Sequence, residues 1–227
     1  MASRNALHGL IRRGRAAAFA STILIAGLVA AAWGEARAAT LSPADKANVE
    51  RALGYLNGIG TLRARFVQIS SNGAYAEGEV LLKRPGRMRF DYDPPVPALL
   101  IADGLSLLYF DRELKEASFL PLWETPLWFL LREEVKLSDD MRVEKVEQAR
   151  GALRVSLRDA SNPDIGAVTL VFQDQPLALR KWQIVDAQGV TTEVSLVNPE
   201  FGVAIASESF EHSNLGIVSP GTRKQDK

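Results

Sequence analysis

Apolar and polar residues alternate along most of this 227-residue chain, and this two-residue period is the strongest constraint on its fold. In Arg87-Met88-Arg89-Phe90-Asp91-Tyr92, apolar side chains fall on one face of an extended segment and charged ones on the other. The pattern recurs at 153–157, 168–172, 182–184 and 190–196, and less regularly at 61–69, 75–83, 98–102, 105–111, 116–120 and 141–148. Turn sequences such as Asp174-Gln175-Pro176 separate these segments. The chain is therefore predicted to be mainly β, with about 10–11 antiparallel strands in a large curved sheet or barrel.

The first forty residues have a different character. Four arginines within residues 4–15 precede an apolar run from Ala16 to Trp33, and the small-x-small sequence Ala36-Arg37-Ala38 follows. This order is typical of a secretory signal peptide. We therefore expect residues 1–38 to be a cleaved signal peptide, 39–218 a single domain, and 219–227 a disordered polar tail. The alternative is a retained signal-anchor helix, because the apolar run is just long enough to span a membrane.

Two segments are predicted to be helical. Ser42-Pro43 supplies an N-cap and a proline for a first helix, which ends near Gly58. A second start at Thr125-Pro126 leads into Leu127-Trp128-Phe129-Leu130-Leu131, which is apolar on every side. Such a short helix must pack against the sheet, either as a plug in the core or as a lid over a cavity.

The chain has few residues of two types that catalytic sites use often, cysteine and histidine. The chain has no cysteine, so thiol chemistry and a cysteine metal site are excluded. His212 is the only histidine beyond the leader, and it serves a catalytic triad only if a serine and an acid converge on it. We expect no enzyme activity, no catalytic residue, no metal and no cofactor. The zero net charge gives no indication of nucleic-acid binding.

Several motifs together resemble one known family. The segment Leu82 to Tyr92, with Lys83-Arg84-Pro85 at its first turn, is similar to a strand pair of the periplasmic outer-membrane lipoprotein carrier (LolA) family. Supporting matches occur at 66–68, 101–104, 107–111 and 125–131, whereas the region after Phe201 matches poorly. The resemblance implies an incomplete, half-open antiparallel β-barrel with an N-terminal helix and a short helical lid over a hydrophobic cavity.

The resemblance also implies a function and a partner set. Members of the family carry acylated lipoproteins through the periplasm from an inner-membrane lipoprotein-releasing ABC transporter to the outer membrane, where a lipoprotein receptor accepts them if one exists. By resemblance, Arg84 hydrogen-bonds lid carbonyls and holds the empty cavity closed. We expect the shuttle to be monomeric.

The resemblance and the alternation together predict which residues surround the cavity. The expected cavity wall is Phe66, Met88, Phe90, Tyr92, Leu99 and Ile101. The expected lid residues are Leu127, Trp128, Leu130 and Leu131. For each of them, ordinary core packing is the alternative, because an apolar period does not distinguish a cavity wall from a core.

Two other functions remain open at this point. The second hypothesis is a sensor or regulatory domain on the same half-barrel fold that binds a lipid or a partner protein. A lipid-modifying hydrolase is the third hypothesis, although the sequence lacks a Gly-x-Ser-x-Gly nucleophile elbow.

Overall fold

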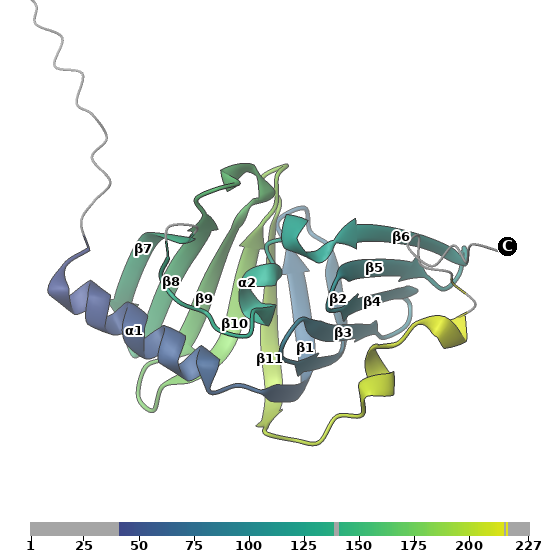
Figure 1. Cartoon of the computed structure of the whole chain (residues 1–227), viewed down its shortest axis with the longest axis horizontal. Coiled ribbons are helices and arrows are strands. Elements are labelled where there is room, and N and C mark those ends of the chain that lie inside the picture. Colours follow the sequence, from purple (N-terminus) through teal and green to yellow (C-terminus); the bar gives the residue numbers. More distant parts are fainter. Residues whose placement is uncertain (1–40, 139–140, 216, 218–227) are drawn as a thin grey trace, which may run out of the picture. The chain divides into compact units, whose positions relative to one another are not determined.

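The computed structural model of the chain describes residues 41–138, 141–215 and 217 (Figure 1). The expected signal peptide and the expected polar tail at 219–227 lie outside these residues. Leu41 onward forms one compact unit. Within the described part of the chain, no helix is both long and apolar enough to cross a bilayer.

All strands belong to one antiparallel sheet in the order β6-β5-β4-β3-β2-β1-β11-β10-β9-β8-β7. Their bounds are β1 Thr61–Ser70, β2 Tyr75–Lys83, β3 Arg87–Tyr92, β4 Ala98–Asp103, β5 Ser106–Asp111, β6 Glu116–Pro121, β7 Met141–Ala149, β8 Ala152–Asp159, β9 Ala167–Gln173, β10 Ala178–Val185 and β11 Thr191–Phe201. Since β6 and β7 are the two ends of this order, the sheet is open. The predicted mainly β, half-open fold with about 10–11 strands is confirmed.

Helix α1 (Pro43–Asn57) packs against one face of the sheet, which we call the inner face (Figure 1). The Ser42 side chain accepts a hydrogen bond from the Asp45 amide, as an N-cap does, and Gly58 follows the last turn. Val49, Leu53 and Leu56 are buried along one side of the helix. Burying each such side chain contributes about 1.5–3 kcal/mol, so packing rather than helix propensity holds α1 in place.

A second helical segment lies on the same face. It consists of a 3₁₀ turn at Leu122–Glu124 and the one-turn helix α2 at Trp128–Leu131. The second helix was expected to start at Thr125-Pro126, but Thr125 instead ends the 3₁₀ turn, its hydroxyl donating to the Leu122 carbonyl at 2.8 Å. We call residues 122–135 the lid segment.

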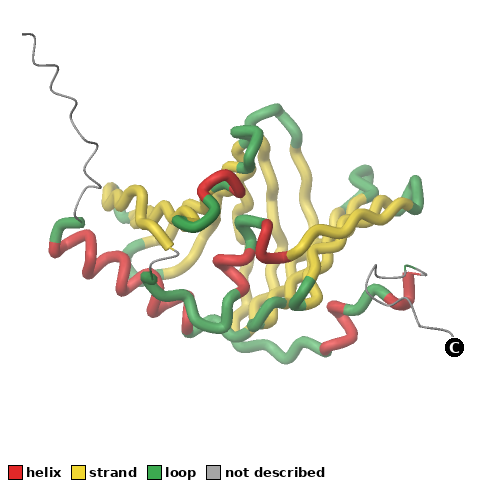
Figure 2. Tube along the Cα trace, turned by 45° about the horizontal axis from the view of Figure 1, so that its top comes forward, coloured by secondary structure: helices red, strands yellow, loops and turns green. Residues whose placement is uncertain are grey.

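The two faces of the sheet have separate apolar clusters. The larger cluster fills the inner face beneath α1 and the lid segment. A smaller cluster lies on the outer face of β2–β5, beneath residues 203–215, which we call the C-terminal strap. The strap contains the short helices η3 (Ser207–Phe210) and η4 (Ser213–Leu215), and in Figure 2 it is the chain of loops and short helices that leads to the C-terminal end.

Candidate ligand-binding site

A pocket of about 370 Å³ lies between the inner face and the lid segment. Its walls come from β1, β3, β4, β5, β10, β11, the β10–β11 turn and the lid segment. The lining residues are Gln68, Phe90, Tyr92, Leu100, Leu107, Thr125, Pro126, Leu127, Trp182, Ile184, Asp186, Val190, Thr192 and Val194. The volume lies within the range of small-molecule sites, and most of the lining is apolar.

Aromatic rings form the centre of the wall. Phe66 packs edge-on against Phe90 and Tyr92, with ring centroids 4.9 and 5.2 Å apart, and Phe90 meets Trp182 at 6.3 Å. The Tyr92 hydroxyl donates to Oε1 of Gln68 at 2.8 Å. Burial raises the pKa of Tyr92 to about 12, although this hydrogen bond opposes the shift, so the hydroxyl stays protonated at neutral pH. The wall is therefore apolar and uncharged at its centre.

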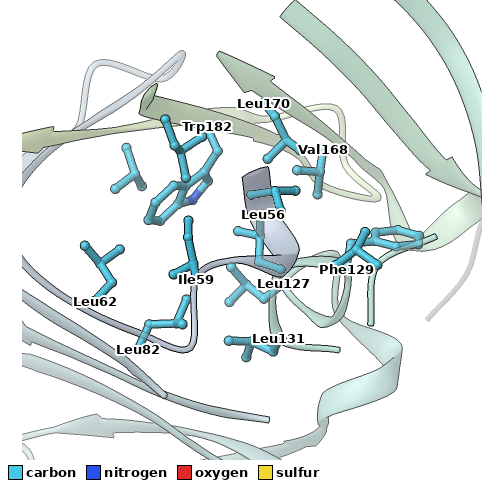
Figure 3. Close-up of a cluster of buried hydrophobic side chains, with 14 of the residues drawn as sticks. Leu56, Ile59, Leu62, Leu82, Leu127, Phe129, Leu131, Val168, Leu170 and Trp182 are labelled. Carbon is cyan, nitrogen blue, oxygen red and sulfur yellow. The ribbon is translucent and has the colours of Figure 1, made fainter. Parts of the chain in front are cut away.

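The lid segment closes one side of the pocket through its first residues. Thr125, Pro126 and Leu127 line the pocket, whereas the helical turn behind them packs into the inner cluster. Figure 3 shows Leu127 and Leu131 in the same apolar interior as Leu56 and Trp182. Phe129, Leu130 and Leu131 of this apolar helix are buried in the inner cluster, and Trp128 is half-buried against it.

Arg84 ties the lid segment to the rest of the domain. Its Nε donates to the Leu130 carbonyl and its Nη1 to the Leu56 carbonyl, both at 2.8 Å, so one side chain links α2 with α1. Burial lowers the pKa of Arg84 to about 10, which leaves the guanidinium charged at neutral pH. A half-buried cation needs acceptors, and the planar guanidinium reaches two carbonyls on different helices.

Backbone and amide bonds add to this attachment. The Gly86 amide donates to the Leu131 carbonyl at 2.8 Å. The Asn57 side chain pairs with both backbone groups of Val135, donating to its carbonyl at 2.9 Å and accepting from its amide at 2.8 Å. The rear of the lid segment, residues 130–135, is thus held by several bonds from α1 and the β2–β3 turn, while its front forms the pocket wall.

Most of the residues expected at the site come together there. Phe90, Tyr92 and Leu127 line the pocket. The others on the inner face are part of the cluster around the pocket without lining it: Phe66, Met88, Trp128, Leu130 and Leu131. Arg84 lies against the lid carbonyl that the resemblance implied, and its role in closing the cavity stays a prediction.

Leu99 and Ile101 are placed differently from the expectation. Both belong to the outer cluster and contact the strap side of the sheet, so they cannot be pocket wall. In the β3–β4 register Phe90 pairs with Leu100, which puts Leu100 on the inner face and its neighbours on the other. Strand β4 is apolar at every position from Ala98 to Ala102, because both of its faces are buried. The strand therefore has no alternation that would show which residues point to the inner face.

Eleven of the fourteen lining residues are not among the residues expected from the sequence. Trp182, Ile184, Thr192 and Val194 line the pocket from β10 and β11, opposite the lid segment. The signal for them was present, because both strands alternate clearly and these residues lie on the apolar side. The sequence gives no sign that β1 pairs with β11, and this pairing joins the two halves of the sheet around one interior.

The fold and the site define a class of protein: an open antiparallel sheet that holds an apolar pocket under a hydrogen-bonded lid, which is the architecture of a carrier for an apolar ligand. The sequence profile of the family described as "Outer membrane lipoprotein carrier protein LolA" matches residues 57–213. The chain belongs to this family, as its motifs suggested. Because this is a family of carriers, the chain is a binding protein and not an enzyme.

Two curated relatives carry the same carrier-protein name. An outer-membrane lipoprotein carrier protein from Azotobacter vinelandii is 27% identical over 75% of this chain and 87% of its own length. One from Legionella pneumophila is 28% identical over 69% and 80% of the two chains. Among solved structures, a LolA superfamily protein from Nitrosomonas europaea has a TM-score of 0.41 at 10% identity, covering 73% of this chain and 98% of that one.

Proposed function

We propose that this protein is a periplasmic chaperone that accepts acylated lipoproteins from an inner-membrane lipoprotein-releasing ABC transporter and delivers them to the outer membrane. The observation that carries the proposal is the apolar pocket beneath a lid segment that Arg84 ties to α1. The names of the curated relatives support the cargo. An outer-membrane lipoprotein receptor is the proposed acceptor where one exists.

Export is part of this proposal. The leader ends in Ala36-Arg37-Ala38, so cleavage after Ala38 would release a domain of residues 39–218 with a short polar tail. A carrier between two membranes must be free of both of them. N-terminal sequencing of the exported protein tests this step, and a mature chain that begins at Ala39 is the expected result.

The energetics of acyl chains explain why a closed pocket is needed. Exposing a sixteen-carbon chain to water costs on the order of 12 kcal/mol, at about 0.8 kcal/mol for each methylene. Two or three such chains anchor a lipoprotein stably in a membrane. The pocket is at the small end of ligand sites, so we propose that the lid segment moves to admit cargo with more than one chain.

Arg84 is proposed to set the balance between the closed and the open lid. Each of its hydrogen bonds to a carbonyl contributes about 1.5–3 kcal/mol, because the donor is charged. Breaking the bond to Leu130 on loading stores free energy that favours closure and hence release of the cargo. We expect Arg84→Leu to fold and to bind lipoprotein, but to transfer it at least about tenfold more slowly.

The matched control for this variant is Arg63→Leu. Arg63 lies on the neighbouring strand β1. Its side chain is 45% exposed and makes a long, exposed ion pair with Glu79, at 4.0 Å. Transfer from loaded carrier to outer-membrane vesicles is measured for both variants and the wild type. Wild-type transfer by Arg84→Leu would exclude the gating role without affecting the proposal that lipoprotein binds.

The carrier proposal itself is tested by extraction of a lipoprotein. Inner-membrane vesicles that contain the transporter and a triacylated lipoprotein are mixed with the protein and ATP, and the supernatant is separated by size. We expect the lipoprotein to elute with the carrier, and an unacylated version to give no such complex. If an active transporter delivers nothing to the protein, the carrier proposal is wrong, and a sensor or regulatory domain on the same fold becomes the better hypothesis.

A further inference from the structure

The two ends of the pocket differ in their exposure. Phe90, Leu107, Leu127, Trp182 and Val194 are buried and form the closed end and sides. Of the eight half-buried lining residues, six lie at one end of the strands: Gln68, Tyr92, Ile184, Asp186, Val190 and Thr192. The other two are Leu100 and Pro126. We call the six residues at that end the rim. The register places the rim far from Arg84, since Gln68 is near the end of β1 that pairs with the start of β2, while Arg84 follows the end of β2.

The rim is also the polar end of the pocket. The Tyr92 hydroxyl and the Gln68 amide bond to each other there, and the Thr192 hydroxyl lies 3.0 Å from that of Ser70. Among the described residues that line the pocket, Asp186 is the one with a charged side chain. A ligand with one apolar tail and one polar head therefore fits in one orientation, with the tail inside and the head at the rim.

The Asp186 carboxylate is held in place by its own turn. Its Oδ1 accepts hydrogen bonds from the amides of Gln188 and Val190, each at 2.9 Å. The backbone closes the same turn, because the Asp186 amide donates to the Val190 carbonyl at 3.1 Å. The negative charge is thus fixed at the edge of an apolar wall, where water screens it less than on an open surface.

We infer that the rim selects ligands by the charge of the head group: Asp186 favours acyl ligands with a cationic or uncharged head and disfavours those with an anionic head. This inference rests on the proposed function and specifies its substrate class. The carboxylate attracts an ammonium head and repels a carboxylate or phosphate head at the same position. A carrier that works between two membranes would thereby be protected from loading with free fatty acids and anionic phospholipids.

The test uses two single-chain probes of equal length, dodecylamine and dodecanoate, below their micelle concentrations at pH 7.5. Their dissociation constants are measured calorimetrically with the full chain as recovered from expressing cells. Asp186→Asn removes the charge but keeps the side-chain oxygen that caps the turn. Asp103→Asn is the matched control, because Asp103 caps the β4–β5 turn in the same way, accepting from the amides of Leu105 and Ser106, and does not line the pocket.

We expect Asp186→Asn to lower the preference for dodecylamine over dodecanoate by about two- to fivefold, the range for partly exposed charge pairs. Asp103→Asn should leave the preference unchanged. High salt should reduce the preference of the wild type toward that of Asp186→Asn, which checks the inference without a substitution. Equal preferences in the wild type and Asp186→Asn would overturn the inference while leaving the carrier proposal intact. Binding of neither probe would overturn the inference, while the extraction experiment decides the carrier proposal separately.

Discussion

At Gly78 the inner face of the sheet has no room for a side chain. A Cβ atom on this residue would lie 2.1 Å from the Asp91 carbonyl oxygen and 2.6 Å from Cε1 of Phe66. The absence of a side chain lets the Phe66 ring lie over β2 and reach Phe90, which forms the pocket wall. This glycine therefore connects the packing of three strands with the shape of the site.

We expect Gly78→Ala to lower the free energy of unfolding by about 1–3 kcal/mol, because the backbone of β3 and the Phe66 ring must both shift. Urea unfolding measures the effect. Gly54→Ala is the control, since no atom lies within 4 Å of its Cβ position in α1 and alanine favours a helix. A Gly78→Ala protein as stable as the wild type would contradict the close packing of Phe66 on β2.

Single residues also show what the sequence could predict. The resemblance and the alternation together predict Phe90 and Tyr92 in the pocket wall, and both lie there. The outer face of β3 is polar, so only one face of this strand can be the inner one. Leu99 and Ile101 were assigned to the wrong face, because β4 has no polar face to reveal the period. Arg84 donates to a backbone carbonyl of the lid segment. Every residue has such a carbonyl, so the sequence pattern could not identify the acceptor, and only the resemblance indicated the lid.

Among the structural elements, the lid segment depends on α1 as much as on the sheet. Asn57, the last residue of α1, pairs with both backbone groups of Val135, whose side chain is buried. Arg84 and Gly86 hold Leu130 and Leu131 a few residues earlier. These bonds are concentrated at the rear of the lid segment, so the front at 125–127 can move without breaking them, whereas opening of the rear must break the Arg84–Leu130 bond.

Asn57→Ala should loosen the rear of the lid segment. Loss of two hydrogen bonds is expected to lower the free energy of unfolding by about 1–2 kcal/mol, and to speed hydrogen exchange at the Val135 amide. Exchange measured by NMR resolves this amide from its neighbours. Asn48→Ala on the same helix is the control, because the Asn48 side chain makes one exposed contact with Gln148 at 3.3 Å. Equal exchange at Val135 in Asn57→Ala and the wild type would contradict the proposed anchor.

A carboxylate of the β9–β10 turn links α1 to the sheet and makes this link sensitive to acid. Asp174 accepts from the Gln148 side chain at 2.6 Å and from Arg51 of α1 at 2.5 Å. The hydrogen bonds from Gln148 and Arg51 hold the pKa of Asp174 below its ordinary value. A carboxylate with a lowered pKa in the folded state stabilises the fold above its ordinary pKa, and this stabilisation is lost as the pH falls through the lowered value.

We therefore expect Asp174→Asn to have a lower urea midpoint than the wild type at pH 7 and pH 5. The difference should shrink below about pH 4, where the Asp174 carboxylate of the unfolded chain takes up its proton, and should vanish as the pH falls through the lowered pKa of the folded protein. Asp164→Asn, at an exposed position of the β8–β9 loop, should show no comparable pH-dependent difference. A difference that stays constant from pH 7 to pH 3 would show that the Asp174 carboxylate charge is not the cause.

For the whole domain, the defining feature is a sheet that is buried on both faces over part of its width. The inner cluster surrounds the pocket, and the strap covers the outer cluster on β2–β5. Lys83 and Arg89 hold the strap by donating to the carbonyls of Ile205 and Ser209 at 3.0 and 3.3 Å. The sequence did not predict the strap, because it has no periodic pattern and its attachment depends on backbone carbonyls.

Phe210→Ala should separate stability from binding. Phe210 is 2% exposed within the outer cluster, so its truncation is expected to cost about 3–5 kcal/mol in the free energy of unfolding. Dodecylamine should bind with an unchanged dissociation constant, because the pocket lies across the sheet. Phe90→Ala is the matched variant on the inner face: it should lose comparable stability and also weaken binding, since its ring lines the pocket. If Phe210→Ala weakens binding as much as Phe90→Ala while the protein remains folded, the two faces are coupled through the strands, and the strap has a part in cargo binding beyond covering the sheet.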